Sequence, residues 1–458
     1  MYAIPTEGKK EMKRRMLFLL VITSLLLFGL TARLAVIQLM EGSKYRLLAE
    51  NQSLTALSDL SVRGTIYDRG NRPLTNMKES FFLLIEDRKV DEDAEKLLHK
   101  MDARFIESSN DKYHVYNIAD IDRTGIKALC RDYGALVMKS RNRYSENQPA
   151  MHIIGYVSQL DQLGVSGIEK DFDTVLASGQ KLYSVQNDGR GYIIPGAGIH
   201  MKDDGREWGV LTTLDLNIQN RVEMVLSDSG KSGAVVVTHI PSGEILASAC
   251  TPGFDPHERE KELVNKATSS TYPAGPFFPL ITATAAPETD REGLSEIVSL
   301  ESFVDTAQAY GLSEEAVDLL SGQAKGNLSE FVEALKTGDA TFDEGQSLLT
   351  ITPMQAARIT RIIALDGWDS KLTAIRGTVE GIRGASFFPK IEGRQAISAE
   401  SIKKIQEQAE GFRGPHWYST FIPEEDPLYG ITLYIEDDYP GESIASSMFR
   451  EIISALRP

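Results

Sequence analysis

Serine and lysine residues spaced for nucleophilic catalysis occur in two segments, Ser178-x-x-Lys181 and Ser401-x-x-Lys404. A spacing of three places both side chains on one face of a helix, where the lysine amine can take the proton of the serine hydroxyl. Neither pair precedes an apolar helix, and Ser401 lies in a charged segment. Because so short a pattern arises by chance in a chain of this length, we expect neither pair to be catalytic.

Metal-binding patterns are absent from the sequence. The seven histidines are scattered and include no HExxH, and two cysteines cannot form a cysteine-based zinc site alone. We therefore do not expect a metalloenzyme. Cys250 is expected to be a small core residue, without a disulfide to Cys130.

The bulk composition is that of a globular protein. Of 458 residues, 42% are hydrophobic and 25% are charged, which excludes a disordered or collagenous chain and suggests two or three domains. The formal net charge is −16. Because nucleic-acid binding requires basic surfaces, we expect no nucleic-acid partner.

One segment departs from this average. Residues 16–40 form an apolar run interrupted by a single charge, Arg33, and are long enough to cross a bilayer core of about 30 Å as a helix. Five basic residues precede the run, so residues 1–15 are predicted to form a cytoplasmic tail and residues 16–40 an uncleaved single-pass anchor. The remaining chain, expected outside the membrane, has 44 basic and 63 acidic residues and a net charge of −19.

The pattern of residues after the anchor predicts an α+β fold. Runs of strands with helices set between them favour this class over a parallel doubly wound sheet. The expected elements are a helix at 44–56, hairpins at 60–75 and 233–249, a strand running into a helix at 211–226 with Asp215 or Asn217 as the N-cap, strands near 417–422 and 430–435, a closing helix at 442–456, and a loop or hinge at 189–205.

Seven segments, read in order, resemble the class B penicillin-binding proteins, the membrane-anchored D,D-transpeptidases that crosslink peptidoglycan. They are RGTIYDR (63–69), RNRYSENQPAMHIIGYV (141–157), GVSGIEKDFD (164–173), LTTLDLNIQ (211–219), PSGEILASACTPGFDP (241–256), EGQSLLTITPMQAARI (344–359) and HWYSTFIP (416–423). The resemblance implies an anchor, a pedestal or dimerisation-like domain at 41–205, and a shortened transpeptidase-like domain at 206–458. This second domain would be an antiparallel sheet flanked by helices.

The resemblance also implies that no cofactor is needed, because the family's mechanism uses neither metal nor nucleotide. It further implies three catalytic motifs, Ser-x-x-Lys, Ser-x-Asn and Lys-Thr-Gly. At the first, the chain reads Tyr272-Pro273-Ala274-Gly275-Pro276-Phe277-Phe278-Pro279, so Pro276 stands at the serine position and Pro279 at the lysine position. Proline offers neither a nucleophile nor a base. Both prolines fall in the first helical turn, where they are tolerated, so the fold can survive without the chemistry.

The other two motifs are missing as well. Only sixteen residues separate Ala286 from the family-like segment at 303–312, too few for the part that normally carries Ser-x-Asn. In the family, Lys-Thr-Gly follows the segment that residues 344–359 resemble, whereas Lys336-Thr337-Gly338 precedes it. We expect these three residues to end a helix, with Gly338 as its cap. Where the resemblance would place Lys-Thr-Gly, before the last strands, residues 411–415 read GFRGP. Arg413 could keep a positive charge there, although a loop is the favoured interpretation.

The sequence therefore predicts a catalytically degenerate, membrane-anchored protein that acts as a scaffold or regulator of cell-wall synthesis. Two alternatives stay open: an active transpeptidase with relocated catalytic residues, and a sensor that binds stem peptides in the old cleft. The expected partners are the lipid bilayer, a polytopic peptidoglycan glycosyltransferase and, for the sensor, a stem peptide. Residues expected to bind a partner or to support the fold are Arg63, Gly64, Asp68, Arg69, Arg143, His152, Gly155 and Glu169. Residues expected to line the former cleft are Gly275, Phe277, Gly345, Gln346 and Arg413.

Overall fold

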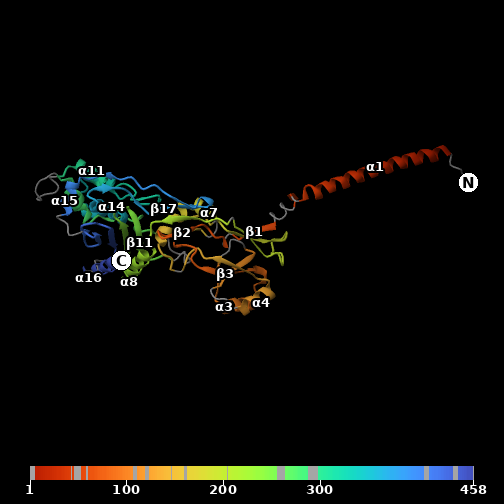
Figure 1. Ribbon diagram of the computed structural model, residues 1–458, viewed down its shortest axis with the longest axis horizontal. Coiled ribbons are helices and arrows are strands. Elements are labelled where there is room, and N and C mark those ends of the chain that lie inside the picture. The colour runs from red at the N-terminus through yellow and green to blue at the C-terminus, as the bar shows by residue number, and fades with distance from the viewer. Residues whose placement is uncertain are drawn as a thin grey trace.

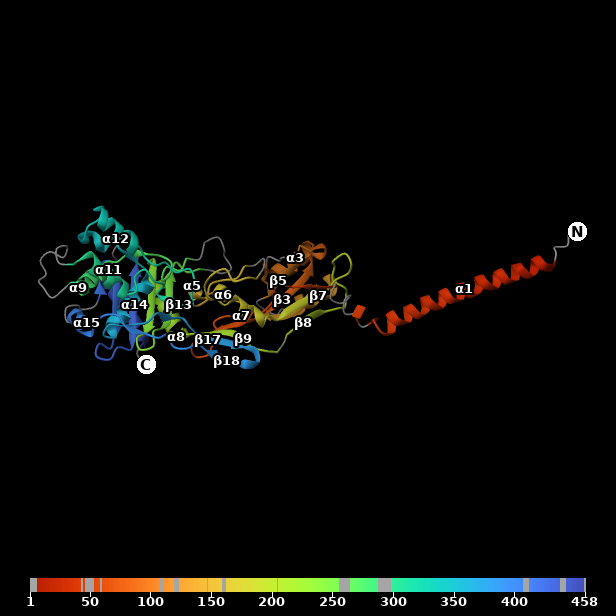
Figure 2. The ribbon, with the colours of Figure 1, turned by 90° about the horizontal axis from the view of Figure 1, so that it is seen from above.

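A long N-terminal helix stands apart from a mixed α+β body in the computed structural model (Figures 1 and 2). The structure describes residues 6–42, 44–45, 53–57, 60–106, 111–118, 123–145, 147–158, 162–203, 205–254, 264–286, 298–406, 412–436 and 442–456. Helix α1 (Thr6–Leu39) leaves its apolar side chains exposed along its length. By length and composition, it could cross a membrane.

The part of the body next to α1 contains two small antiparallel sheets. One has the strand order β4-β5-β3-β6 and the other β1-β7-β8. Helices α3 (Glu92–Lys100) and α4 (Arg123–Tyr133) share a hydrophobic core with the first sheet. The strands are β1 (Leu54–Ala56), β3 (Glu79–Glu86), β4 (Ala103–Ile106), β5 (Tyr113–Ile118), β6 (Leu136–Arg141), β7 (Leu182–Gln186) and β8 (Ile199–Lys202).

A third sheet joins segments that lie far apart in the sequence. Its order is β18-β17-β9-β2, with β2 (Thr65–Tyr67), β9 (Trp208–Thr212), β17 (Ile375–Glu380) and β18 (Ala385–Phe387). Strand β2 pairs in parallel with β9, and β9 pairs antiparallel with β17. Since β2 comes from residues 41–205 and β9 and β17 from residues 206–458, one sheet connects the two expected domains.

The distal part of the body is built on a seven-stranded sheet of order β13-β16-β11-β10-β22-β21-β20. The central pairs are antiparallel, whereas β16 pairs in parallel with both β11 and β13. The strands are β10 (Gly233–His239), β11 (Glu244–Thr251), β13 (Val317–Asp318), β16 (Leu372–Thr373), β20 (Phe412–Arg413), β21 (Trp417–Ile422) and β22 (Tyr429–Ile435).

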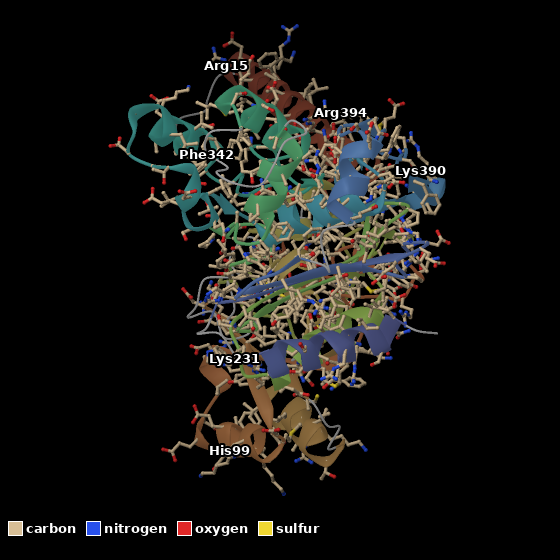
Figure 3. The ribbon with its side chains drawn as sticks, turned by 90° about the vertical axis from the view of Figure 1, so that its left-hand side faces the viewer. Arg15, His99, Lys231, Phe342, Lys390 and Arg394 are labelled. Atoms are coloured by element: carbon tan, nitrogen blue, oxygen red, sulfur yellow. The ribbon has the colours of Figure 1, made fainter. Side chains whose placement is uncertain are left out.

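Helices cover both faces of this sheet (Figure 3). On one face α8 (Leu216–Asp228) and α16 (Glu442–Leu456) pack on alternate residues of the strands, such as Val235 and Leu433. On the other face lies the fully buried α14 (Pro353–Ala364), together with α9 (Phe277–Ala285) and α11 (Leu300–Ala309). Further short elements are β12 (Tyr272–Pro273), β14 (Thr350–Ile351), α5 (Met151–Ile154), α6 (Gly167–Asp171), α7 (Asp173–Ser178), α12 (Leu328–Thr337), α13 (Gly345–Leu348), β15 (Trp368–Asp369), β19 (Arg394–Gln395) and α15 (Ala399–Gln406).

Several expected elements are confirmed. The segment at 211–226 runs from β9 into α8, and Asp215 is the N-cap that accepts hydrogen bonds from the amides of Asn217 and Ile218. The hairpin at 233–249 forms as β10 and β11, and the last strands and closing helix lie where expected. The hairpin expected at 60–75 is wrong in part: a turn forms around Asp68, but the return segment is not a strand and meets β2 in an isolated bridge between Pro73 and Tyr67, while β2 pairs with β9.

Three further expectations were wrong in part. The helix predicted at 44–56 does not reach its end, because residues 54–56 form β1 and pair with β7; residues 46–52 lie outside the described residues. The loop or hinge at 189–205 contains strand β8, which also pairs with β7. The loop expected at 411–415 contains strand β20 at the sheet edge. In each case pairing with a distant strand overrides the local preference.

Candidate functional site

The two prolines at the expected catalytic positions lie in the first turn of α9. Pro276 is the N-cap residue, with helical φ and ψ of −66° and −14°, and Pro279 follows within the first turn. The first amides of a helix have no intrahelical partner, so proline forfeits no hydrogen bond there. The helix forms as expected, and neither side chain carries a group that can attack a carbonyl or move a proton.

Aromatic rings pack directly beside this turn. Phe277 stacks on Phe412 of β20, with ring centroids 5.6 Å apart, and meets Trp417 of β21 edge-on at 5.4 Å. The indole Nε1 of Trp417 donates to the carbonyl oxygen of Pro273 at 2.8 Å. All three rings are buried. We call Phe277, Phe412 and Trp417 the aromatic plug, because they join the start of α9 to the edge of the sheet.

The remaining residues of the expected cleft surround the plug. Gly275 adopts a φ of +50°, and a Cβ there would lie 2.9 Å from the Trp417 ring. Its amide donates to the carbonyl of Gln346. Gly345 lies against the ring of Phe278, where a Cβ would come within 2.0 Å. The structure thus brings Gly275, Phe277, Gly345 and Gln346 together, while Arg413 is exposed beside Phe412 on β20.

The serine–lysine pairs found in the sequence have other partners. Ser178 donates to the carbonyl of Thr174, and Lys181 forms an ion pair with Asp203 at 2.7 Å. Ser401 lies within α15, where its amide donates to Ser398 Oγ. Gly338, at the end of the Lys336-Thr337-Gly338 segment, caps α12 with a φ of +82°, as expected.

One serine–lysine contact was missed by sequence reasoning. Ser232 Oγ lies 2.5 Å from Lys266 Nζ, and Glu436 Oε2 lies 2.5 Å from each of them. Burial alone would raise the pKa of Glu436, but hydrogen bonds from Lys266, Ser232 and Tyr272 lower it overall. The amine of Lys266 is thus held in an ion pair with this carboxylate. The three residues are 34 and 170 positions apart, so no local pattern could reveal them.

A buried ion cluster lies near the start of β2. Arg143 donates to Glu169 from Nε at 2.7 Å and to the carbonyl of Gly64 at 2.6 Å. Arg63 pairs with Asp173 at 2.6 Å, lies 3.6 Å from Glu169 and donates to the carbonyl of Gln162. Glu169 is fully buried. We call Arg63, Arg143, Glu169 and Asp173 the junction cluster.

Two further motif residues hold the turn after β2. Asp68 Oδ1 accepts from the amides of Gly70 and Arg72, and its other oxygen accepts from Arg72 Nε at 2.7 Å. Arg69 lies 3.4 Å from Glu244, which also pairs with Arg376 at 2.7 Å. These contacts link the turn to β11 and β17 and are structural.

His152 lies in α5, which packs against α6, the helix that carries Glu169 of the junction cluster, and Gly155 follows the end of α5. The backbone carbonyl of His152 accepts from Asn265 Nδ2 at 2.8 Å. Gly155 has a φ of +75°, and a Cβ would lie 1.9 Å from the carbonyl oxygen of Ser166, so only glycine fits.

No group of three or more histidine, cysteine or carboxylate side chains that could hold a metal occurs among the described residues. Cys130 and Cys250 are both free, and Cys250 is buried.

The sequence and the fold of this chain are similar to those of known proteins. The model of the penicillin-binding protein transpeptidase domain matches residues 292–416. The peptidoglycan D,D-transpeptidase FtsI of Buchnera aphidicola is 22% identical over 95% of this chain and 93% of its own length. MrdA of Escherichia coli, another peptidoglycan D,D-transpeptidase, is 23% identical over 54% of this chain and 47% of its own length.

The chain is thus similar to the class B penicillin-binding proteins over most of its length.

Solved structures share the fold. A Helicobacter pylori penicillin-binding protein, PBP2, in complex with MreC has a TM-score of 0.58 at 15% identity, covering 88% of this chain and 98% of that chain. A peptidoglycan synthetase from Bifidobacterium adolescentis has the same TM-score at 18% identity, with 88% and 96% covered. The seven-stranded sheet between helices is thus the transpeptidase fold of penicillin-binding proteins, joined to an N-terminal apolar helix.

Proposed function

We propose that this protein is a class B penicillin-binding protein without catalytic activity, a pseudo-transpeptidase that acts as a scaffold or regulator in peptidoglycan synthesis. The observation that carries the proposal is the first turn of α9, where Pro276 and Pro279 occupy the positions of the family's serine and lysine. Because the nucleophile and its base act as a unit, the loss of both removes the basis of acyl transfer.

The aromatic plug supports a scaffold over a stem-peptide sensor. A sensor would need an open groove between the start of α9 and the edge strand β20. Phe277 and Phe412 instead stack on each other across this boundary and are buried. Pro276 also lies beside Gly414, where a Cβ would come 3.0 Å from the proline ring. The ring stacking leaves little room for an extended peptide on this edge.

We further propose that α1 anchors the protein in the membrane with its N-terminus in the cytoplasm. The helix is apolar and exposed, and basic residues cluster before residue 16. On this interpretation residues 1–15 are the tail, 16–40 the anchor, 41–205 the pedestal and 206–458 the transpeptidase-like domain.

The partners proposed for the anchor and pedestal are proteins of the cell-wall machinery, in particular a polytopic glycosyltransferase. A relative of the same fold has been solved in complex with MreC, which supports a protein-binding role for such a chain. The pedestal motif residues Arg63, Arg143 and Glu169 would then serve partners indirectly, by fixing the shape of the surface.

The loss of chemistry is tested by labelling the purified full chain in detergent with fluorescent penicillin. We expect no boil-resistant adduct under conditions in which E. coli MrdA is labelled. A covalent adduct would contradict the proposal. If labelling occurred and disappeared in Ser232→Ala, the active site would have moved to the contact of Ser232 with Lys266, the one observation that favours the enzyme alternative.

The scaffold role is tested by exchanging residues 16–40 for an unrelated membrane helix, so that anchoring is kept. We expect a glycosyltransferase that co-purifies with the parent to be lost or strongly reduced. Equal recovery with both proteins would argue against partner binding through the anchor. Saturable binding of a stem peptide to the parent would instead favour the sensor.

A further inference from the structure

Strand β18 forms an open edge of the third sheet. The order of this sheet is β18-β17-β9-β2, so β18 has a neighbouring strand on one side only. Figure 2 shows it at the lower margin of the body. All three residues of the strand are exposed, and the stretch Ala-Ser-Phe-Phe at 385–388 carries no charge. Because an exposed, uncharged edge is open to pairing with another chain, proteins normally avoid one.

The backbone of β18 offers hydrogen-bonding groups on its open side. The amide of Phe388 donates to the carbonyl of Arg376 on β17 at 2.7 Å, so the groups of Phe388 face β17. Since successive residues of an antiparallel strand alternate in the side they face, the groups of Ala385 and Phe387 face away from β17. Pro389 follows and has no amide proton, so an added strand would find its donors at these two residues.

The side chains of β18 divide between the two faces of the sheet. Phe388 stacks on Phe172, with ring centroids 6.4 Å apart, so its face packs against the residue that joins α6 and α7. Phe387 points to the other face, lies opposite Gly377 of β17 and is 68% exposed. Because glycine has no side chain, the Phe387 ring has no cross-strand neighbour on β17. An added strand would place an apolar side chain against this ring.

The nearest charged side chains on either side of the uncharged stretch are basic. Arg383 precedes β18 and Lys390 follows it, and both are exposed; Figure 3 shows Lys390 at the outer margin of the molecule. Neither forms an ion pair with another described residue. Farther out, Glu380 accepts a hydrogen bond within β17, and Glu392 is followed by Arg394. The open edge is thus apolar in the middle and positive at both ends, on a chain whose net charge is −16.

These charges disfavour pairing between two copies of the chain. The outward-facing backbone groups of two copies would match in an antiparallel pair centred on Ser386. In that pair Arg383 of each copy would lie beside Lys390 of the other. Like charges facing each other destabilise paired strands. The edge therefore suits a strand with acidic residues at both ends rather than a second β18.

We propose that β18 is a docking edge for an extended segment of a partner protein, which adds to the sheet as a further strand. The backbone of the segment bonds to Ala385 and Phe387, and its apolar side chains cover the Phe387 ring. Its acidic ends face Arg383 and Lys390. This docking edge depends on the fold, and neither on the loss of catalysis nor on partner binding through α1.

The probe is a synthetic eight-residue peptide of alternating valine and threonine with an aspartate at each end. One control peptide carries lysine at both ends, and another is methylated on its backbone nitrogens. Fluorescence anisotropy with the full chain in detergent, at low ionic strength, measures binding. We expect saturable binding of the acidic peptide and affinities weaker by about tenfold or more for both controls. No saturable binding of the acidic peptide, or equal binding of all three, would overturn the proposal.

Two variants and two matched controls localise the binding. Ala385→Pro removes an outward-facing amide without removing a bond to β17, and Phe387→Ala removes the exposed ring, so both should fold and weaken binding about tenfold or more. Ala385→Val keeps the amide, and Phe105→Ala removes an exposed phenylalanine of another edge strand, β4; neither should change binding. Parent-like affinity in both variants would show that the peptide does not bind at β18.

Hydrogen exchange locates the bound peptide independently of the variants. We expect slower exchange at residues 383–390 in the presence of the acidic peptide, because outward-facing amides become hydrogen-bonded. Unchanged exchange there, despite binding, would place the peptide elsewhere and contradict the assignment. Light scattering of the parent and of Phe387→Ala gives the oligomeric state. A parent dimer that is lost in the variant would assign the edge to a second copy and overturn the choice of partner.

Discussion

The junction cluster and the aromatic plug are both buried parts of family-motif segments, but different forces hold them together. The cluster joins Arg63 and Arg143 to Glu169, a carboxylate that is fully removed from water. The plug joins α9 to β20 and β21 through ring contacts and one indole hydrogen bond. Charged side chains thus pair with one another in the first region, whereas aromatic side chains and prolines fill the second.

The strongest test of this comparison is Glu169→Ala. The substitution leaves two buried guanidinium groups without their shared carboxylate, and we expect a loss of about 3–5 kcal/mol in the free energy of unfolding. Chemical denaturation of the full chain in detergent, followed by circular dichroism, measures it. Glu79→Ala, which removes an exposed pair with Lys139, is the control and should cost much less. Similar losses for both would show that the junction cluster does not support the fold.

The corresponding change in the plug is Phe277→Ala. It removes a buried ring that contacts both Phe412 and Trp417, and we expect a loss of about 3 kcal/mol from the cavity that remains. Phe387→Ala, at an exposed phenylalanine of β18, is the matched control and should change stability by less than about 0.5 kcal/mol. If Phe277→Ala were as mild as its control, the plug would be loosely packed and the cleft able to open.

The third prediction concerns how the stability of the fold depends on pH through His152 of α5, whose ring is neutral near pH 7. Its pKa is lowered to about 4 in the folded protein, first by burial and then by Lys266, while an unfolded histidine titrates near 6.5. The unfolded state therefore binds the proton first as the pH falls, and stability is lost between about pH 6.5 and pH 4. The expected loss from this residue is about 2 kcal/mol between pH 7.5 and pH 5.

Comparing the parent with His152→Gln at the two pH values isolates this contribution from that of the many carboxylates. The variant should show a weaker pH dependence over the same range. An unchanged dependence would mean that the ring is protonated in the folded state, so that burial and the charge of Lys266 do not prevent it.

The smallest effect is expected for the double variant Pro276→Ser, Pro279→Lys. Both positions accept ordinary residues in a first turn, although a lysine there faces the positive end of the helix dipole, so stability should change by about 1 kcal/mol or less. We expect no penicillin adduct, because the buried Phe412 stands on the edge strand and the plug closes the approach. Covalent labelling of the double variant would show that chemistry was lost through these two residues alone.

Local signals in the sequence predicted much of the distal fold. The N-cap at Asp215, the hairpin of β10 and β11 and the cap at Gly338 depend on neighbouring residues, so they could be identified from the sequence. Strands β1, β8 and β20 were missed because each is short and pairs with a strand that the local sequence does not reveal.

The features of the candidate site also differ in whether neighbouring residues in the sequence could reveal them. The prolines at 276 and 279, on which the prediction of lost catalysis rests, were visible in one contiguous segment. The plug was not, because Phe277, Phe412 and Trp417 meet only through the sheet. The contact of Ser232 with Lys266 and Glu436 likewise combines residues from distant segments.

The sheet formed by β2, β9 and β17 has a consequence for how the protein is made. Strand β9 lies between β2, near residue 65, and β17, near residue 375. The sheet therefore cannot be completed until about three hundred residues after β2 have been synthesised. Contacts of such long sequence separation slow folding, and they leave strand edges open in the meantime. The part of the chain made first is thus the part whose folding is completed late, and a nascent chain stalled before residue 375 would expose an edge of β9 to other proteins.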